Sequence, residues 1–207
     1  MARSADWYFD VISPFAYLQF MHFHRLPDDL EVTLKPVLFA GLLGHWEHKG
    51  PAEIPAKRTQ TYRYTHWLAE QLGVPFRTPP AHPFIPLKPL RLILAGQCSR
   101  DIVAASFDYI WGQGGDVNDD VAFEQFFADK GFTEALANIG DATVKQALRS
   151  NTEEAVARGV YGVPTYLVED EAWFGREHLP RVAWILSGRQ GPAPQVANLR
   201  FAEGGAP

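Results

Sequence analysis

The sequence predicts an α/β fold in which a βαβ unit and a ββα unit are separated by a long, all-helical insertion. Three observations lead to this prediction. Two strand-like segments with a helix between them occupy the first forty residues. Residues 40–155 then have helical spacing, and no segment of strand character competes with it. Strand character returns at residues 163–174 and is followed by one further helical segment.

The βαβ unit begins with a short aromatic strand, Trp7–Val11, followed by Ser13 and Pro14. Serine is a preferred N-cap and proline a preferred first helical residue, so a helix is predicted from this point to about Leu26. A Pro-Asp-Asp sequence ends it, and a second strand is predicted over Leu30–Phe39. A strand, a helix and a strand this close together predict a parallel pair with a right-handed crossover.

The insertion is predicted to consist of helices joined by irregular segments. Residues 44–55 form a loop rich in His, Gly and Pro, and residues 78–89 hold five prolines, which favours an extended connection. The predicted helices are Ala56–Leu72, Pro89–Cys98, Asp101–Trp111, Asp120–Ala128, Thr133–Ile139 and Asp141–Arg158.

The ββα unit consists of strands at Val163–Val168 and Ala172–Phe174, an acidic turn between them, and a helix from about Glu177 to Leu186. This order of elements is the thioredoxin topology interrupted by helices. We therefore expect a discontinuous thioredoxin-like domain of residues 1–39 and 156–190 and a helical insert of residues 40–155. Residues 191–207 are rich in Gly, Pro and Ala and are expected to form a flexible tail.

Composition excludes several classes of function. The chain has 207 residues, 46% of them hydrophobic, and a net charge of -5 without a basic stripe, which argues against a nucleic-acid partner. Its apolar runs are too short to span a membrane, and no signal peptide precedes the first strand, so we expect a cytoplasmic protein without a membrane partner. The single cysteine, Cys98, excludes an intrachain disulfide and a C-x-x-C pair, and it is predicted to be a buried small residue.

Ser13 is the first candidate for chemistry. The start of a helix presents free N–H groups and the positive end of the helix dipole, where a bound thiolate would be stabilised. A hydrogen bond from the serine hydroxyl to that sulfur would contribute roughly 1.5–3 kcal/mol, or about one to two pKa units. Taken alone, Ser13 is better explained as a helix cap without a catalytic role.

The segment Val163-Pro164-Thr165 changes that assessment. A proline that opens a strand marks an edge or a special turn. Thioredoxin-like domains carry a cis proline at this place, beside the first turn of the active-site helix, and the preceding residue offers main-chain groups to an extended cysteinyl peptide. A trans bond is far commoner among proteins generally. The combination with Ser13 and Pro14 predicts a cis Val163-Pro164 bond.

These residues resemble a known family. Several short motifs occur in the same order in the 2-hydroxychromene-2-carboxylate isomerases and the kappa-class glutathione transferases, and the resemblance extends from Trp7 to about Leu186. The motifs are residues 9–18 (FDVISPFAYL), 49–51 (KGP), 55–58 (PAKR), 111–112 (WG), 162–165 (GVPT) and 174–175 (FG). The first motif and the GVPT motif are specific when they occur together.

The resemblance implies a glutathione site. The catalytic serine of the family, which contacts the glutathione sulfur, corresponds to Ser13, and the cis-proline pair corresponds to Val163 and Pro164. The family's Gly-x-Asp-Arg segment, which holds the γ-glutamyl end, corresponds to the four residues Gly175, Arg176, Glu177 and His178.

This sequence departs from the family at three binding positions. Glu177 replaces an aspartate, so a longer side chain would have to pair with the γ-glutamyl amine. His178 replaces an arginine and is mostly neutral near pH 7. His48 stands where relatives commonly carry an asparagine that helps to bind glutathione.

The leading functional prediction is a glutathione-dependent isomerase acting on 2-hydroxychromene-2-carboxylate or a similar aromatic carboxylate, and its relatives suggest a homodimer. One alternative is a glutathione transferase or peroxidase acting on another electrophile, and a second is a non-catalytic glutathione-binding protein.

Trp46 and Phe84 would line an aromatic pocket or fill the core of the insert, and Lys57 and Arg58 would orient a carboxylate or form an exposed helix face. Metal-ligand spacing is absent from the remaining histidines, which are assigned to surface or partly buried positions: His22, His24, His45, His66 and His82.

Overall fold

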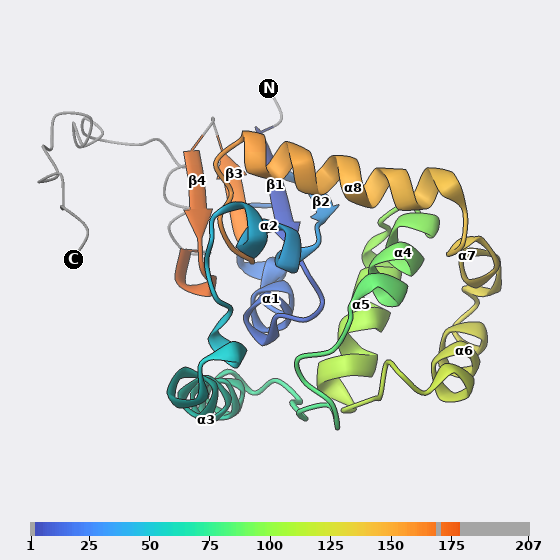
Figure 1. Ribbon diagram of the computed structural model, residues 1–207, viewed down its shortest axis with the longest axis horizontal. Coiled ribbons are helices and arrows are strands. Elements are labelled where there is room, and N and C mark those ends of the chain that lie inside the picture. Colours follow the sequence, from blue (N-terminus) through green and yellow to red (C-terminus); the bar gives the residue numbers. More distant parts are fainter. Residues whose placement is uncertain (1–2, 169–170, 179–207) are drawn as a thin grey trace, which may run out of the picture.

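A mixed four-stranded sheet in the order β2-β1-β3-β4 forms the centre of the computed structural model, which describes residues 3–168 and 171–178 (Figure 1). β1 (Arg3–Phe9) pairs in parallel with β2 (Leu30–Pro36). β3 (Thr165–Val168) is antiparallel to β1, and β4 (Glu171–Phe174) is antiparallel to β3. The predicted order, a βαβ unit followed after a helical stretch by a β-hairpin, is confirmed.

Helices make up most of the remaining described residues. They are α1 (Pro14–Phe20), α2 (Phe39–His45), α3 (Pro55–Leu72), α4 (Leu87–Ala95), α5 (Arg100–Phe107), α6 (Asp120–Asp129), α7 (Thr133–Asn138) and α8 (Ala142–Ala157). A π-helical turn extends α5, and no helix in the described part of the chain is long and apolar enough to cross a membrane.

Four predicted boundaries near the start of the chain are wrong. β1 begins at Arg3 rather than at Trp7. It ends at Phe9 rather than at Val11, because the main-chain oxygen of Asp10 accepts from the Ser13 N–H at 3.1 Å and its side chain accepts from the Ile12 N–H at 3.0 Å, which forms a turn. α1 ends at Phe20, and a separate 3₁₀ turn follows it instead of a continuous helix.

The second strand ends at Pro36, and α2 begins at Phe39 where the strand was expected to continue. The first amides of α2 have distant partners. The Leu38 N–H donates to Oγ1 of Thr152 at 3.0 Å, and the Phe39 N–H donates to Oδ2 of Asp10 at 2.9 Å. Partners this far away in the sequence stabilise a helix start that local pattern does not indicate.

The C-terminal part of the prediction lies largely outside the described residues. Arg176–His178 form a 3₁₀ turn at the start of the helix predicted for Glu177–Leu186, and residues 179–207, which include the predicted tail, are not described.

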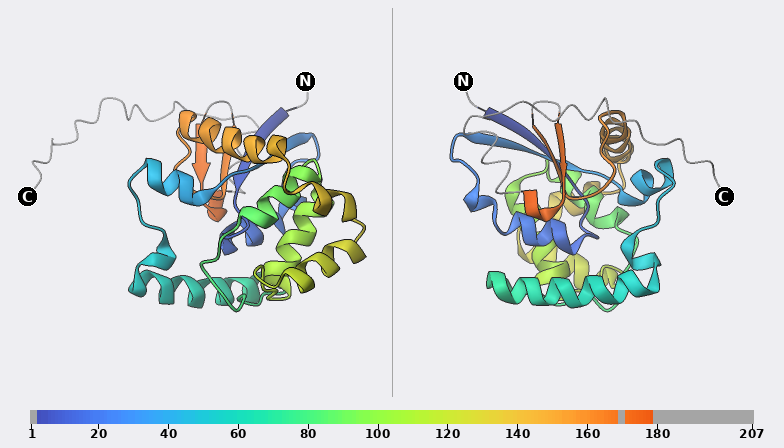
Figure 2. Two further views of the ribbon diagram at one scale, coloured as in Figure 1. Left: turned by 45° about the vertical axis from the view of Figure 1, so that its right-hand side comes forward. Right: turned by 90° about the vertical axis from the view of Figure 1, so that its left-hand side faces the viewer.

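The two faces of the sheet are covered by different helices (Figure 2). Alternate side chains of β1 point to opposite faces. Trp7 and Phe9 stack with ring centroids 4.5 Å apart in the larger core, together with Phe107 of α5. Tyr8 lies on the other face, in a smaller core with Leu42 of α2 and Ala155 of α8. The first turn of α1 and the start of α2 are thereby placed at the same end of β1.

Candidate active site

A cavity of about 1070 Å³ opens beside the start of α1. α1, the start of α2, the first half of α3 and the segment before β3 contribute to its wall. The residues predicted from the sequence that line it are Ser13, His48, Lys57, Arg58, Phe84 and Val163. The structure thus brings together residues that are up to 150 positions apart in the chain. We refer to this cavity as the cleft.

Ser13 is buried at the base of the cleft and caps α1, as predicted. Its Oγ accepts from the Ala16 N–H at 3.2 Å and donates to the main-chain oxygen of Val163 at 3.4 Å. The second bond is long for a hydroxyl donor, so little is lost when the hydroxyl turns toward a better acceptor in the cleft. A sulfur anion at this position would meet the hydroxyl and the positive end of α1 together.

The Val163-Pro164 peptide bond is cis, which confirms the prediction made from the GVPT motif. Val163 is buried, and its main-chain oxygen faces the Ser13 hydroxyl. Pro164 does not line the cleft, but its main-chain oxygen accepts from the Gly175 N–H at 2.9 Å. A second cis bond, His82-Pro83, was not predicted.

The loop before Ser13 is fixed by bonds to its carbonyl groups. Nε1 of Trp111 donates to the Val11 oxygen at 2.8 Å, and Trp111 is fully buried. Nε2 of His82 is 2.9 Å from the Ile12 oxygen, an acceptor, so this nitrogen carries the hydrogen. These two rings stack edge to face at 5.1 Å, and together they hold the residues immediately before Ser13 in one conformation.

Asp10 is a buried carboxyl group at the base of the cleft to which the sequence analysis gave no role. Its two oxygens accept from the N–H groups of Ile12 and Phe39, and it thereby joins the active-site loop to the start of α2. Burial raises its pKa from 3.8 to about 7. The two hydrogen bonds lower the pKa, but their effect is smaller than that of burial. The sequence feature that could have indicated this role is the position of a charged residue directly after an aromatic strand, because charged residues are seldom buried without a partner.

His82 and Tyr62 form a second polar feature that was missed. The Tyr62 hydroxyl lies 2.6 Å from Nδ1 of His82, and because Nε2 carries the hydrogen, Tyr62 is the donor. Burial lowers the pKa of His82, which favours this neutral ring. His82 is partly buried, as expected, but its role in holding the loop was not predicted. His22 is more buried than predicted, with Nδ1 at 2.8 Å from the Leu18 oxygen.

Some predicted site residues lie away from the cleft wall. Gly175, Arg176 and Glu177 do not line it. They lie beside α1, where Nε2 of Gln19 donates to the Gly175 oxygen at 3.1 Å. Gly175 has a φ angle of 111°, a conformation that favours glycine. A Cβ atom at this position would lie 2.7 Å from the carboxylate oxygens of Glu177, so glycine leaves the space that this side chain occupies. The side chain of His178 is outside the described residues.

The cleft combines apolar walls with a cationic edge. Phe84 is buried in its wall, whereas Lys57 and Arg58 are exposed at the start of α3. Trp46 does not line it, because its Nε1 donates to the Val160 oxygen at 3.0 Å and its ring packs elsewhere. Within residues 3–168 and 171–178 no group of His, Cys, Asp and Glu side chains could hold a metal ion. The arrangement suits an anion held against an apolar body.

Comparison with known proteins supports this description. The chain is 29% identical to glutathione S-transferase kappa 2 of Caenorhabditis elegans, over 89% of this chain and 92% of the relative. It is 26% identical to 2-hydroxychromene-2-carboxylate isomerase of Sphingobium xenophagum, over 86% of this chain and 95% of the relative. The resemblance identified from the motifs is confirmed.

A solved structure of 2-hydroxychromene-2-carboxylate isomerase has the same fold. It superposes with a TM-score of 0.77 at 20% identity and covers 89% of this chain and 94% of that one. Residues 5–187 match the DSBA-like thioredoxin domain family. The predicted thioredoxin-like fold is therefore confirmed, and the chain belongs to the DSBA-like thioredoxin family.

Proposed function

We propose that this protein is a glutathione-dependent enzyme that isomerises 2-hydroxychromene-2-carboxylate or a similar aromatic carboxylate. The observation that carries the proposal is the position of the Ser13 hydroxyl, 3.4 Å from the Val163 oxygen at the base of a cleft with cationic residues at its edge. The proposal is supported by two relatives, a kappa-class transferase and a chromene carboxylate isomerase, each similar to this chain over most of its length.

Glutathione would be held by main-chain groups and by Ser13. Its cysteinyl unit would extend along Val163, and its sulfur would lie at the Ser13 hydroxyl. The hydroxyl would donate to the thiolate, and the start of α1 would add the favourable end of its dipole. A single such bond lowers the thiol pKa by about one to two units, which makes the thiolate abundant near neutral pH.

The reaction would proceed by reversible addition of this thiolate. When the chromene ring opens, the bond between the ring oxygen and the hemiketal carbon breaks, and the hemiketal proton moves to the ring oxygen, which leaves a phenol and a ketone. The thiolate then forms a C–S bond at the conjugated carbon, and the π electron pair moves toward the ketone to give an enolate. The former double bond is then single and can rotate. Return of the electron pair re-forms the double bond as trans and expels the same thiolate. Glutathione is regenerated, and the reaction requires no oxidant.

The substrate would be oriented by the cleft residues that take no part in activating sulfur. Lys57 and Arg58 would bind the carboxylate, and Phe84 would contact the aromatic ring. Holding the ring and the thiolate in contact converts a bimolecular addition into an effectively unimolecular one.

The test compares serine-to-alanine substitutions at two helix N-caps. Ser13 Oγ accepts from the Ala16 N–H, and Ser99 Oγ accepts from the Ile102 N–H at the start of α5. Both variants lose a cap, which costs about 1 kcal/mol of stability. Only Ser13→Ala is expected to raise the pKa of bound glutathione, by about one to two units, and to lower the isomerisation rate about 10- to 100-fold. Thiolate absorbance and the rate on 2-hydroxychromene-2-carboxylate are measured with and without glutathione. Equal results for the two variants would exclude the role of Ser13.

Glutathione transfer to another electrophile is the second candidate, favoured by the 29% identity to a kappa transferase. The same Ser13 thiolate would then attack an aryl halide and remain bonded to the product. Product analysis separates the two, because isomerisation leaves the glutathione concentration unchanged and transfer consumes it. A calorimetric titration that shows no heat with millimolar glutathione would argue against both reactions.

A homodimer forms part of the proposal. Tyr64 and Trp67 on α3 are 46% and 53% exposed, and their rings stack 5.9 Å apart. Two exposed aromatic rings on one helix face are typical of a contact between protein molecules. Sedimentation equilibrium of wild type and of the Trp67→Lys variant tests this, and a monomeric wild type would contradict it.

A further inference from the structure

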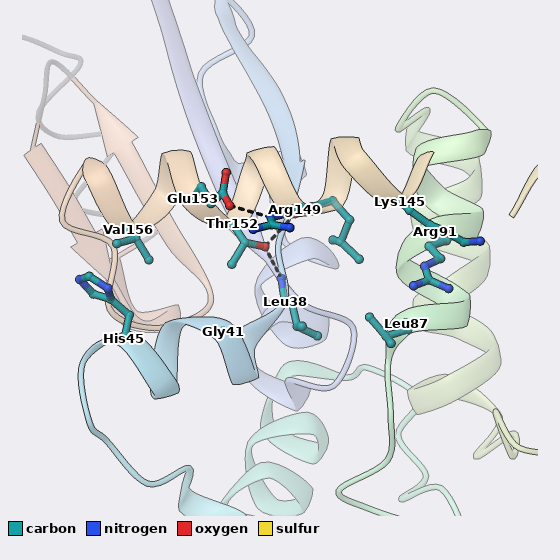
Figure 3. Close-up of a pocket in the computed structure, with 11 residues that line it drawn as sticks. Leu38, Gly41, His45, Leu87, Arg91, Lys145, Arg149, Thr152, Glu153 and Val156 are labelled. Carbon is teal, nitrogen blue, oxygen red and sulfur yellow. Dashed lines mark hydrogen bonds and ion pairs between the residues drawn. The ribbon is translucent and has the colours of Figure 1, made fainter. Parts of the chain in front are cut away.

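A second cavity of about 500 Å³ lies between α2, α4 and α8 (Figure 3). We call it the α8 pocket. α8 contributes one face, with residues spaced three and four apart. Its lining residues are Leu38, Gly41, His45, Leu87, Arg91, Lys145, Leu148, Arg149, Thr152, Glu153 and Val156. Leu38 and Leu87 also line the cleft, so the two cavities share a wall.

The α8 pocket holds more positive than negative charge. Arg91, Lys145 and Arg149 line it, and Glu153 is the one carboxylate that the described residues contribute. Glu153 is already paired, because Nε of Arg149 lies 2.8 Å from its Oε1. No ion pair between described residues involves Arg91 or Lys145. Figure 3 shows these two side chains at the α4 end of the pocket.

Arg91 carries the most direct sign of a missing partner. Its Nε is buried and has no hydrogen-bond partner in the described part of the chain. Buried polar groups in folded proteins are nearly always paired, so an unpaired guanidinium nitrogen beside a cavity calls for an explanation. A planar anion in the pocket would accept from Nε and from a terminal nitrogen of the same guanidinium in the bidentate geometry that arginine prefers.

The rest of the wall is apolar. Leu38, Leu87, Leu148 and Val156 provide most of it, and α2 and α8 approach each other closely at one side. At this contact a Cβ on Gly41 would lie 2.9 Å from Cγ2 of Thr152. A cavity of this size and lining, with a few converging polar groups at one end, is typical of a small-molecule site.

We propose that the α8 pocket binds a small organic carboxylate with an apolar body. The carboxylate would lie between Arg91 and Lys145, and the apolar body would contact the leucine wall shared with the cleft. A phosphorylated sugar or nucleotide fits less well, because the apolar wall offers few partners for its hydroxyl groups. The inference rests on the α8 pocket alone and does not depend on the function proposed for the cleft.

The test is a calorimetric titration with 1-naphthoate in the absence of glutathione. Wild type is compared with Arg91→Met, which keeps the apolar stem, with Lys57→Met in the cleft, and with Arg63→Met on the exposed side of α3. Arg91→Met is expected to weaken one binding event at least ~10-fold, the loss that follows from removing a charge-assisted bond. Arg63→Met is expected to bind as wild type does, and Lys57→Met to retain the Arg91-dependent event.

Thermal unfolding separates a binding role from a structural one. Because Arg91→Met removes a buried donor without a partner, its Tm without ligand is expected to equal or exceed that of wild type. Neutral 1-naphthalenemethanol is expected to lack the Arg91-dependent event. Binding of 1-naphthoate that is unchanged in Arg91→Met, equal binding of the neutral analogue, or a lowered Tm would each overturn the proposal. If Lys57→Met left every binding event unchanged, the carboxylate-binding role of Lys57 in the cleft would be contradicted and the α8 pocket proposal would be unaffected.

Discussion

The cleft and the α8 pocket lie on either side of one wall, yet their polar groups are used differently. Around the cleft, Trp111, His82 and Asp10 bond to main-chain groups of the loop before Ser13 and of α2. In the α8 pocket, Nε of Arg91 has no partner in the described residues. Side chains that hold the cleft in shape therefore contribute to stability, whereas Arg91 is available to a ligand. Substitutions on the two sides should affect stability to very different extents.

The largest effect is expected for Trp111→Ala. Trp111 is fully buried, stacks on Phe76 at 5.5 Å and donates to the Val11 oxygen. Removing it leaves a cavity and an unpaired carbonyl, which costs about 3–5 kcal/mol of unfolding free energy. Val121→Ala is the control, because Val121 is 80% exposed, and a cost within about 0.5 kcal/mol is expected there. Urea unfolding measures both, and similar losses would contradict the comparison.

A pH-dependent effect is expected at Asp10. Its pKa in the folded state is about 7, against 3.8 for the ordinary group, so between these pH values the folded protein keeps a proton that the unfolded chain releases. The contribution of Asp10 to stability is fully present below about pH 4 and decreases as the pH rises to about 7, by up to about 1.4 kcal/mol per pH unit.

Asp10→Asn isolates this contribution, because asparagine does not titrate. The variant loses one of the two main-chain bonds at every pH, since an amide has only one oxygen. The difference in unfolding free energy between wild type and variant should therefore change steadily from pH 4 to pH 7 in urea titrations. A difference that stays constant over this range would show that Asp10 is ionised throughout in the folded protein.

The same contrast explains how much the sequence could predict. Periodicity and caps placed α3 within one residue at its start, and Ser13 with Pro14 located the start of α1. Strand character at Val163–Val168 located β3. These features are local, because each depends on residues within one or two helical turns or one strand. The cis bond before β3 was predicted only by combining its proline with Ser13 and Pro14 and with the resemblance to thioredoxin-like domains.

The features that were not predicted depend on contacts between distant residues. α2 was missed because its first two amides bond to Thr152 and Asp10, and its own residues carry no cap. His82 was assigned no role because its partners, Ile12 and Tyr62, are 70 and 20 positions away. The α8 pocket requires three helices to converge, and no spacing within one helix predicts that convergence.

A smaller loss is expected for Tyr62→Phe. Tyr62 is partly exposed, so water can replace its bond to Nδ1 of His82, and the expected cost is about 0.5–1.5 kcal/mol of unfolding free energy. Tyr161→Phe is the control, since Tyr161 is 45% exposed, and no measurable change is expected there. Equal stability of the two variants would show that the bond to His82 contributes nothing to holding the loop.

The smallest effect on stability is expected at Glu153, on the α8 pocket side. Its ion pair with Arg149 joins side chains that are 62% and 73% exposed, so solvent screens it and Glu153→Gln should leave the Tm unchanged. The substitution removes the one carboxylate that lines the pocket and frees Arg149. Binding of 1-naphthoate should therefore tighten a few-fold, with a larger gain at low salt because the attraction is less screened. Lys145→Met should weaken binding in the same titration. If Glu153→Gln weakened binding instead, Glu153 would be acting as a ligand contact, and the pocket would select a group that carries a hydrogen-bond donor rather than a carboxylate.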